Sequence, residues 1–273
     1  MQRNRRWIKA VSEMNKAKSA KHVSVAGHRR DFRLTPLCAS LVALGLSVML
    51  GQVCAQTINL TSADPSYALS GDQTVTAITV ANNVSGSIAG PGHTLTYAGA
   101  TNGFSLGGTT SGTSQALDMS GLTNFVFNNP TQAFTVGGAS SAGTAAATGT
   151  LTLASASNVI TASSFNIANI TNGGSNAAST NYGVVQLGQS NTINADTINV
   201  GTGAKTNGTL QFQSGITDGM LVLRGTNGTS PVTNWNIGTN GYSQYVNTTG
   251  IVDLSAGSLD ADVVNITIGE APS

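Results

Sequence analysis

A pattern of one small polar residue between two large apolar residues recurs in seven copies at similar spacing along this chain, from residue 78 to residue 266. The seven copies are Ile78-Thr79-Val80, Phe104-Ser105-Leu106, Phe134-Thr135-Val136, Phe165-Asn166-Ile167, Ile198-Asn199-Val200, Trp235-Asn236-Ile237 and Val264-Asn265-Ile266. The residue that follows each copy is always small, and neighbouring copies begin 26 to 37 positions apart, with a mean of 31. Such a period is typical of proteins built from stacked structural repeats.

Two longer alignments within the chain indicate that the period is regular. Residues 157–167 match residues 190–200 at an offset of 33 with five identical pairs, and residues 193–200 match residues 259–266 at an offset of 66. The second offset is twice the first, which predicts a chain that returns to the same position on every turn. An antiparallel β-sandwich also has short strands and frequent turns, but it does not explain these offsets.

The geometry of a β-strand indicates which fold this pattern favours. Neighbouring residues of a strand point to opposite faces, so both apolar residues of each copy face inward. One strand cannot bury its apolar face alone, whereas copies stacked about 4.8 Å apart bury a continuous core. We therefore predict an all-β fold, a right-handed parallel β-helix (β-solenoid) over residues 56–273, with turns at the Asn-Gly pairs that begin at Asn102, Asn172, Asn207, Asn227 and Asn240.

The middle residues of the copies form a column along the predicted solenoid. After Thr79, Ser105 and Thr135 the column consists of asparagines, namely Asn166, Asn199, Asn236 and Asn265. Stacked asparagines can share side-chain hydrogen bonds from turn to turn, so we interpret the column as a structural ladder rather than a ligand-binding stripe. We expect residues 57–88 to cap the first turn, and an incomplete solenoid after the last copy.

Composition excludes several other classes of protein. Only 8% of the residues are charged and 33 are glycines, which argues against coiled coils and helical bundles. Residues 1–56 contain ten basic and two acidic residues, whereas residues 57–273 contain two basic and nine acidic ones. The long acidic segment lacks the clustered Lys and Arg that contact phosphates, so we expect no nucleic-acid partner.

The basic residues belong to an export signal. A ten-residue apolar core, residues 41–50, follows them, and Val53 and Ala55 place modest side chains at the −3 and −1 positions of a cleavage site. We predict a signal peptide over residues 1–55, α-helical or disordered, that is cleaved between Ala55 and Gln56. A transmembrane anchor and a lipoprotein at Cys54 are the alternatives. Both cysteines would leave with the signal peptide.

Forty residues precede the apolar core, more than a simple signal peptide needs. Among them Trp7 is followed by Ala10-Val11-Ser12-Glu13 and then by Lys16, Lys18 and Lys21. This region resembles the second half of the extended signal peptide region of type V secretion proteins, the autotransporters and haemagglutinin-like adhesins of Gram-negative bacteria. The resemblance implies export by the Sec translocon, passage through an outer-membrane translocator barrel, and a passenger at the cell surface or outside the cell.

Catalytic signatures are scarce in the predicted passenger. Its single histidine, His93, has no nucleophile motif beside it, and Ser70-Gly71-Asp72 is merely a turn. The cysteine and histidine clusters of zinc sites and the aspartates of calcium-binding repeats are missing, so we expect no metal and no cofactor. Asp196 and Asp262 occupy equivalent positions in the alignment, about 9 to 10 Å apart, with no third carboxylate converging on them.

These observations predict a non-enzymatic passenger, the N-terminal portion of an adhesin that mediates attachment or aggregation through an unidentified host or sister-cell ligand. One alternative is a β-helix lyase or hydrolase that acts on carbohydrate. The other is a haemagglutinin-like exoprotein of two-partner secretion, although Asn129-Pro130-Thr131 replaces the Asn-Pro-Asn motif expected there.

Overall fold

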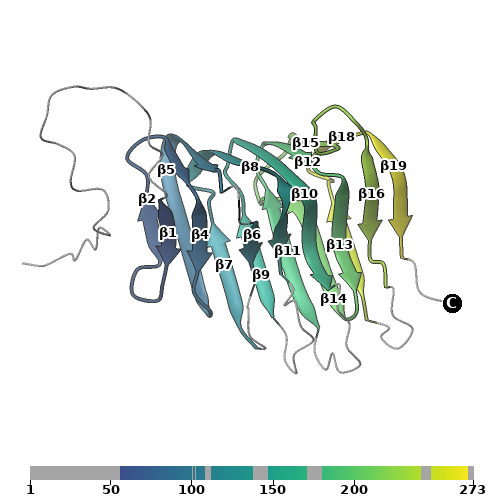
Figure 1. Ribbon diagram of the computed structural model, residues 1–273, viewed down its shortest axis with the longest axis horizontal. Helices are drawn as coiled ribbons and strands as arrows, with labels where there is room; N and C mark the ends of the chain where they lie inside the picture. Colours follow the sequence, from purple (N-terminus) through teal and green to yellow (C-terminus); the bar gives the residue numbers. More distant parts are fainter. Residues whose placement is uncertain are drawn as a thin grey trace, which may run out of the picture. The chain divides into compact units, whose positions relative to one another are not determined.

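The computed structural model describes residues 56–99, 101, 103–107, 112–137, 147–170, 180–240 and 247–269. This part of the chain is all-β and contains no helix. Its strands pair in parallel throughout, in one sheet of seventeen strands and one of two. Figure 1 shows that the colours progress along the stack from blue at β1 to yellow at β19, so that strands of successive turns lie side by side. The predicted helical or disordered signal peptide lies outside the described residues.

The large sheet consists of three stacks of parallel strands, and the chain visits them in the same order on each turn. The first stack contains β2 (Ser66–Ala68), the first half of β5 (Val84–Tyr97), β7 (Ser114–Asp118), β9 (Thr148–Thr152), β11 (Asn181–Leu187), β14 (Thr206–Phe212) and β17 (Thr249–Asp253). The second contains β3 (Gln73–Val75), the second half of β5, the first halves of β8 (Leu122–Val136) and β10 (Ser157–Ile170), β12 (Ser190–Asn194), β15 (Gly219–Arg224) and β18 (Gly257–Ala261).

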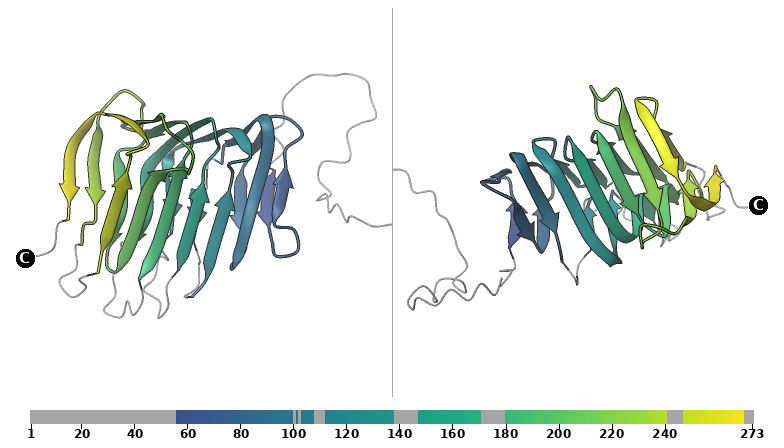
Figure 2. Two further views of the ribbon diagram at one scale, coloured as in Figure 1. Left: turned by 180° about the vertical axis from the view of Figure 1, so that it is seen from behind. Right: turned by 90° about the horizontal axis from the view of Figure 1, so that it is seen from above.

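The third stack contains the recurring apolar-polar-apolar motif. It consists of β6 (Phe104–Leu106), the second halves of β8 and β10, β13 (Thr197–Gly203), β16 (Val232–Ile237) and β19 (Val263–Ile268). Phe104 pairs with Phe134, Phe134 with Phe165, and Phe165 with Ile198. Figure 2 shows from two further sides how the stacked strands follow one another. The prediction of stacked parallel repeats is therefore confirmed, with a solenoid-like arrangement of the strands.

The offset of 33 residues is confirmed, because Ser157 pairs with Ser190 and Asn166 with Asn199. The offset of 66 is wrong. Asn199 pairs with Asn236 and Asn236 with Thr267, which gives steps of 37 and 31 residues and a total of 68. The last copy of the motif is thus Ile266-Thr267-Ile268, two residues later than predicted. A shift of two residues keeps every side chain on its face, so both registers satisfy the same alternating pattern.

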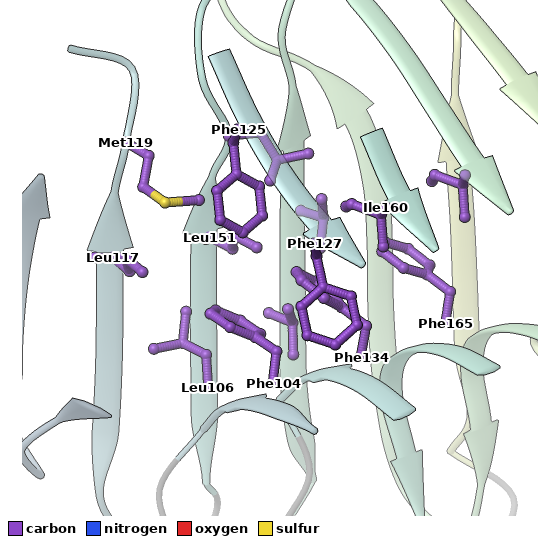
Figure 3. Close-up of a cluster of buried hydrophobic side chains, with 14 of the residues drawn as sticks. Phe104, Leu106, Leu117, Met119, Phe125, Phe127, Phe134, Leu151, Ile160 and Phe165 are labelled. Atoms are coloured by element: carbon purple, nitrogen blue, oxygen red, sulfur yellow. The ribbon is translucent and has the colours of Figure 1, made fainter. Parts of the chain in front are cut away.

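The apolar interior runs through all three stacks. Phe104, Phe134 and Phe165 stack with near-parallel rings, at centroid distances of 4.3 and 5.3 Å, and each is almost fully buried (Figure 3). Phe127 meets Phe134 edge to face, and its ring also packs on Tyr97. The Tyr97 hydroxyl donates a hydrogen bond to the carbonyl of Gly103, and burial raises the pKa of this phenol. Aromatic stacking thus adds to the area buried by each turn.

The small residue after each motif has a geometric cause. Gly137, Gly201 and Gly238 have φ values of 71°, 62° and 64°, where a side chain is strained. They also touch a column of inward glycines in the first stack. A Cβ atom on Gly137 would lie 2.2 Å from the carbonyl oxygen of Tyr182, and one on Gly208 would lie 2.2 Å from the amide nitrogen of Gly201. The backbones of the two stacks therefore approach each other directly here.

Asn207-Gly208 was expected to form a turn, and this prediction is wrong. Both residues lie inside strand β14, where Gly208 pairs with Gly183 on one side and Gly250 on the other. The glycine is required for close packing rather than for a left-handed turn. Asn227-Gly228 does form a turn, with a φ of 77° at Gly228.

The two ends of the described unit differ. Residues 57–88 were expected to cap the solenoid, and within them β1 (Thr57–Leu60) pairs with β4 (Ala77–Val80) in the separate two-stranded sheet. Ile58 and Leu60 of β1 are buried in the common core. At the other end Val264, Ile266 and Ile268 of β19 are 62%, 56% and 72% exposed. Within the described residues, β19 pairs with β16 alone.

Candidate binding surface

The predicted asparagine ladder brings three of its four members together. Asn199 Nδ2 donates to Asn166 Oδ1 at 2.8 Å, and Asn236 Nδ2 donates to Asn199 Oδ1 at 2.9 Å. Asn265 lies in the neighbouring column instead, where its amide donates to Asn234 Oδ1 at 3.3 Å. Thr267 takes the place next to Asn236 because of the two-residue register shift. The ladder amides donate to one another, which leaves them less free to bind a ligand.

A second, more deeply buried ladder is formed by Asn158 and Asn191, each 1% exposed. Asn158 Nδ2 donates to Asn191 Oδ1 at 2.9 Å, and its Oδ1 accepts from the amide of Ala154 at 3.0 Å. Asn191 Oδ1 likewise accepts from the amide of Gly188 at 3.1 Å, and its Nδ2 donates to the carbonyl of Gly188 at 2.8 Å. These two side chains provide hydrogen-bond partners for backbone groups at two equivalent corners. Sequence reasoning aligned the two residues at the offset of 33 but did not assign them this role.

The charged residues of the described chain are dispersed. Asp196 lies at the corner between β12 and β13, where its Oδ1 accepts from the amide of Thr226 at 2.9 Å. Asp262 lies between β18 and β19, and Arg224 pairs with Asp260 at 2.8 Å. His93 Nδ1 is 3.8 Å from Asp72 Oδ1. Among the described residues, no three His, Cys, Asp or Glu side chains gather closely enough to hold a metal ion.

The outer face of the first stack has a shallow depression of about 320 Å³ near its last two strands. Its lining consists of Gln186, Gln211, Phe212, Gln213, Ser214, Gly215, Ile216, Asp253, Ser255 and Ala256. Three of these side chains form one column, because Gln186 of β11 pairs with Gln211 of β14 and Gln211 with Asp253 of β17. Their amide and carboxylate groups therefore line up at about 4.8 Å intervals on an outward face.

A longer corner forms one side of this depression. Six residues, 213–218, connect β14 to β15, whereas only Gly188 and Gln189 connect β11 to β12 one turn earlier. Gln213 holds the corner in place, because its Nε2 donates to the carbonyl of Leu153 at 2.8 Å. The opposite side is the short corner from Leu254 to Ala256. The depression thus results from an insertion in one repeat.

Asp253 is the only ionisable residue among those lining the depression. Its Oδ1 accepts from the hydroxyl of Ser255 at 2.6 Å and from the amide of Ser255 at 3.0 Å. These two hydrogen bonds hold the pKa of the Asp253 carboxyl below its ordinary value of 3.8. The Asp253 carboxylate is an anion at neutral pH and is held through Oδ1, and its second oxygen makes no hydrogen bond in the described part of the chain.

The predicted cleavage site falls at the edge of the described residues. Ala55 lies outside them, as does the rest of the signal peptide. Gln56 is part of the folded unit, since its Nε2 donates to the hydroxyl of Tyr67 at 2.8 Å and its carbonyl accepts from the amide of Thr76 at 2.9 Å. In the ranges that the structure describes, no helix has the length and apolarity to cross a membrane.

Comparisons of the chain with protein-family models, with curated proteins and with solved structures gave no match.

Proposed function

We propose that this chain is an exported, adhesin-like bacterial passenger whose residues 56–273 wind as a right-handed parallel β-helix and bind other surfaces. The observation that carries the proposal is the continuous parallel pairing of strands from β5 to β19, which forms a stack of similar turns. Such stacks offer long outer faces for contact, and each further turn extends the same face. Right-handed winding is the usual connection between parallel strands.

The outer faces support recognition by shape and hydrogen bonding. Outward positions of the first stack include Thr150, Gln186, Thr209 and Gln211, all neutral donors and acceptors on a regular grid. Individually such contacts are weak, but repetition along a rigid surface raises the effective affinity. This suits attachment to surfaces that also repeat, such as glycans or the same protein on a sister cell.

Export rests on the predicted signal peptide and its resemblance to type V secretion proteins. Cleavage before Gln56 would leave all nineteen described strands in the mature chain, since β1 begins at Thr57. The Sec translocon and an outer-membrane translocator barrel would be its partners in export. The enzyme alternative receives less support, because the carboxylate of Asp196 already accepts a hydrogen bond from the backbone amide of Thr226.

The test is deletion and complementation of the gene in the source bacterium. We expect antibodies against residues 56–273 to label intact wild-type cells, and the exported chain to begin at Gln56. The deletion strain should lose adhesion, autoaggregation or biofilm, and the complemented strain should regain it. Unchanged adhesion, aggregation and biofilm in the deletion strain would contradict the proposal.

A further inference from the structure

We propose that the depression between the 213–218 corner and the Leu254–Ala256 corner is a binding site for a neutral oligosaccharide. The inference rests on the proposed function and deepens it by naming a ligand class and a site. It starts from the column of Gln186, Gln211 and Asp253, whose side chains lie on successive strands of one outer face. Planar amides and carboxylates recognise pairs of neighbouring hydroxyl groups, because they present two hydrogen-bonding atoms side by side.

The polar groups of this column are available to a ligand. Gln211 makes no side-chain hydrogen bond within the described part of the chain, although it is half-buried. Gln186 uses only its Oε1, which accepts from the Thr152 hydroxyl at 3.0 Å, so that its NH₂ group is free. This contrasts with the asparagine ladder of the third stack, where Asn199 both donates and accepts within the column. The two columns have similar chemistry, but only this one retains free donors at a depression.

Apolar groups complete the surface that a sugar needs. Ile216 and Ala256 are half-buried lining residues, and Phe212 lies at the floor with 6% of its surface exposed. The C–H faces of a sugar ring can pack on such atoms while its hydroxyls reach the amide column. The column spans about 10 Å over three strands, which matches two consecutive sugar rings rather than one.

Charge selects against anionic glycans. Asp253 is the single ionisable group of the lining, and the bonds from Ser255 fix the position of its carboxylate. The lining contains no Lys or Arg, and Arg224 of the neighbouring β15 is paired with Asp260. A sulfated or sialylated sugar would therefore place its negative charge beside a carboxylate with no compensating cation. We accordingly assign the site to uncharged sugars with adjacent hydroxyl groups.

The experiment uses the full 273-residue chain on an array of neutral oligosaccharides of glucose, galactose, mannose and N-acetylhexosamine, together with sialylated and sulfated ones. The best neutral probe is then titrated by calorimetry against Gln211→Ala, Asp253→Asn and the matched control Gln132→Ala. Gln132 is a half-buried glutamine of β8 that is not among the residues lining the depression. Thermal unfolding of each variant verifies that it is folded.

We expect neutral probes to bind, and Gln211→Ala and Asp253→Asn to raise Kd by about fivefold or more, the effect of losing one hydrogen bond. Gln132→Ala should leave Kd unchanged. Binding confined to anionic probes, no binding at all, or equal Kd values in all variants would overturn the inference. Cell adhesion without saccharide binding would overturn the saccharide site and leave the proposed function standing. Saccharide binding without cell adhesion would support the site and contradict the proposed function.

Discussion

At the scale of single residues, the structure separates two kinds of asparagine that look alike in the sequence. Asn158 bonds to both backbone groups of Ala154 and to Asn191 in the interior. Asn158→Ala should lower the free energy of unfolding by about 2 to 4 kcal/mol, because it leaves several buried polar groups unpaired. Asn199→Ala, in the half-buried outer ladder, should cost about 1 kcal/mol. Urea denaturation of the three proteins tests the difference, and equal costs would contradict it.

Glycines also differ by position. Gly137→Ala would place a methyl group 2.2 Å from the carbonyl oxygen of Tyr182 and would strain a residue with a φ of 71°. We expect it to destabilise the fold by about 2 kcal/mol or more. Gly71→Ala is the matched control, since a Cβ there meets nothing within 4 Å. The measurement is the melting temperature, and a Gly137→Ala protein that melts with the wild type would refute the close approach of the two backbones.

At the scale of elements, the phenylalanine column joins β6, β8 and β10. Phe134 lies between Phe104 and Phe165 and is fully buried, so Phe134→Ala should create a cavity that neighbouring turns cannot fill. The expected loss is about 3 to 5 kcal/mol, and Phe134→Leu should lose less because it keeps most of the volume. Chemical denaturation followed by circular dichroism measures both. A smaller loss for Ala than for Leu would show that the column does not determine local packing.

At the scale of the whole described unit, stability should vary along the stack. β10 pairs with β8 on one side and with β12 and β13 on the other, whereas β19 pairs within the described residues only with β16. In a repeat architecture each turn is stabilised by its immediate neighbours. We therefore expect amide hydrogen exchange to be slowest in β8, β10 and β13 and fastest in β19. Mass spectrometry of exchanged peptides tests this order, and uniform protection would contradict it.

The sequence by itself determined the parallel stacking, the inward side chains and the asparagine pairs at the offset of 33. The alternation of inward and outward residues and the period of the repeat can be read from the sequence even where the exact register between strands cannot. It did not determine the register of the last turn, because a shift of two residues preserves the alternation. Nor did it reveal the role of Gly208 or the depression beside Gln211, since both depend on how corners of different length meet in space. Contacts between separate turns belong to the tertiary structure, and only the assembled stack decides them.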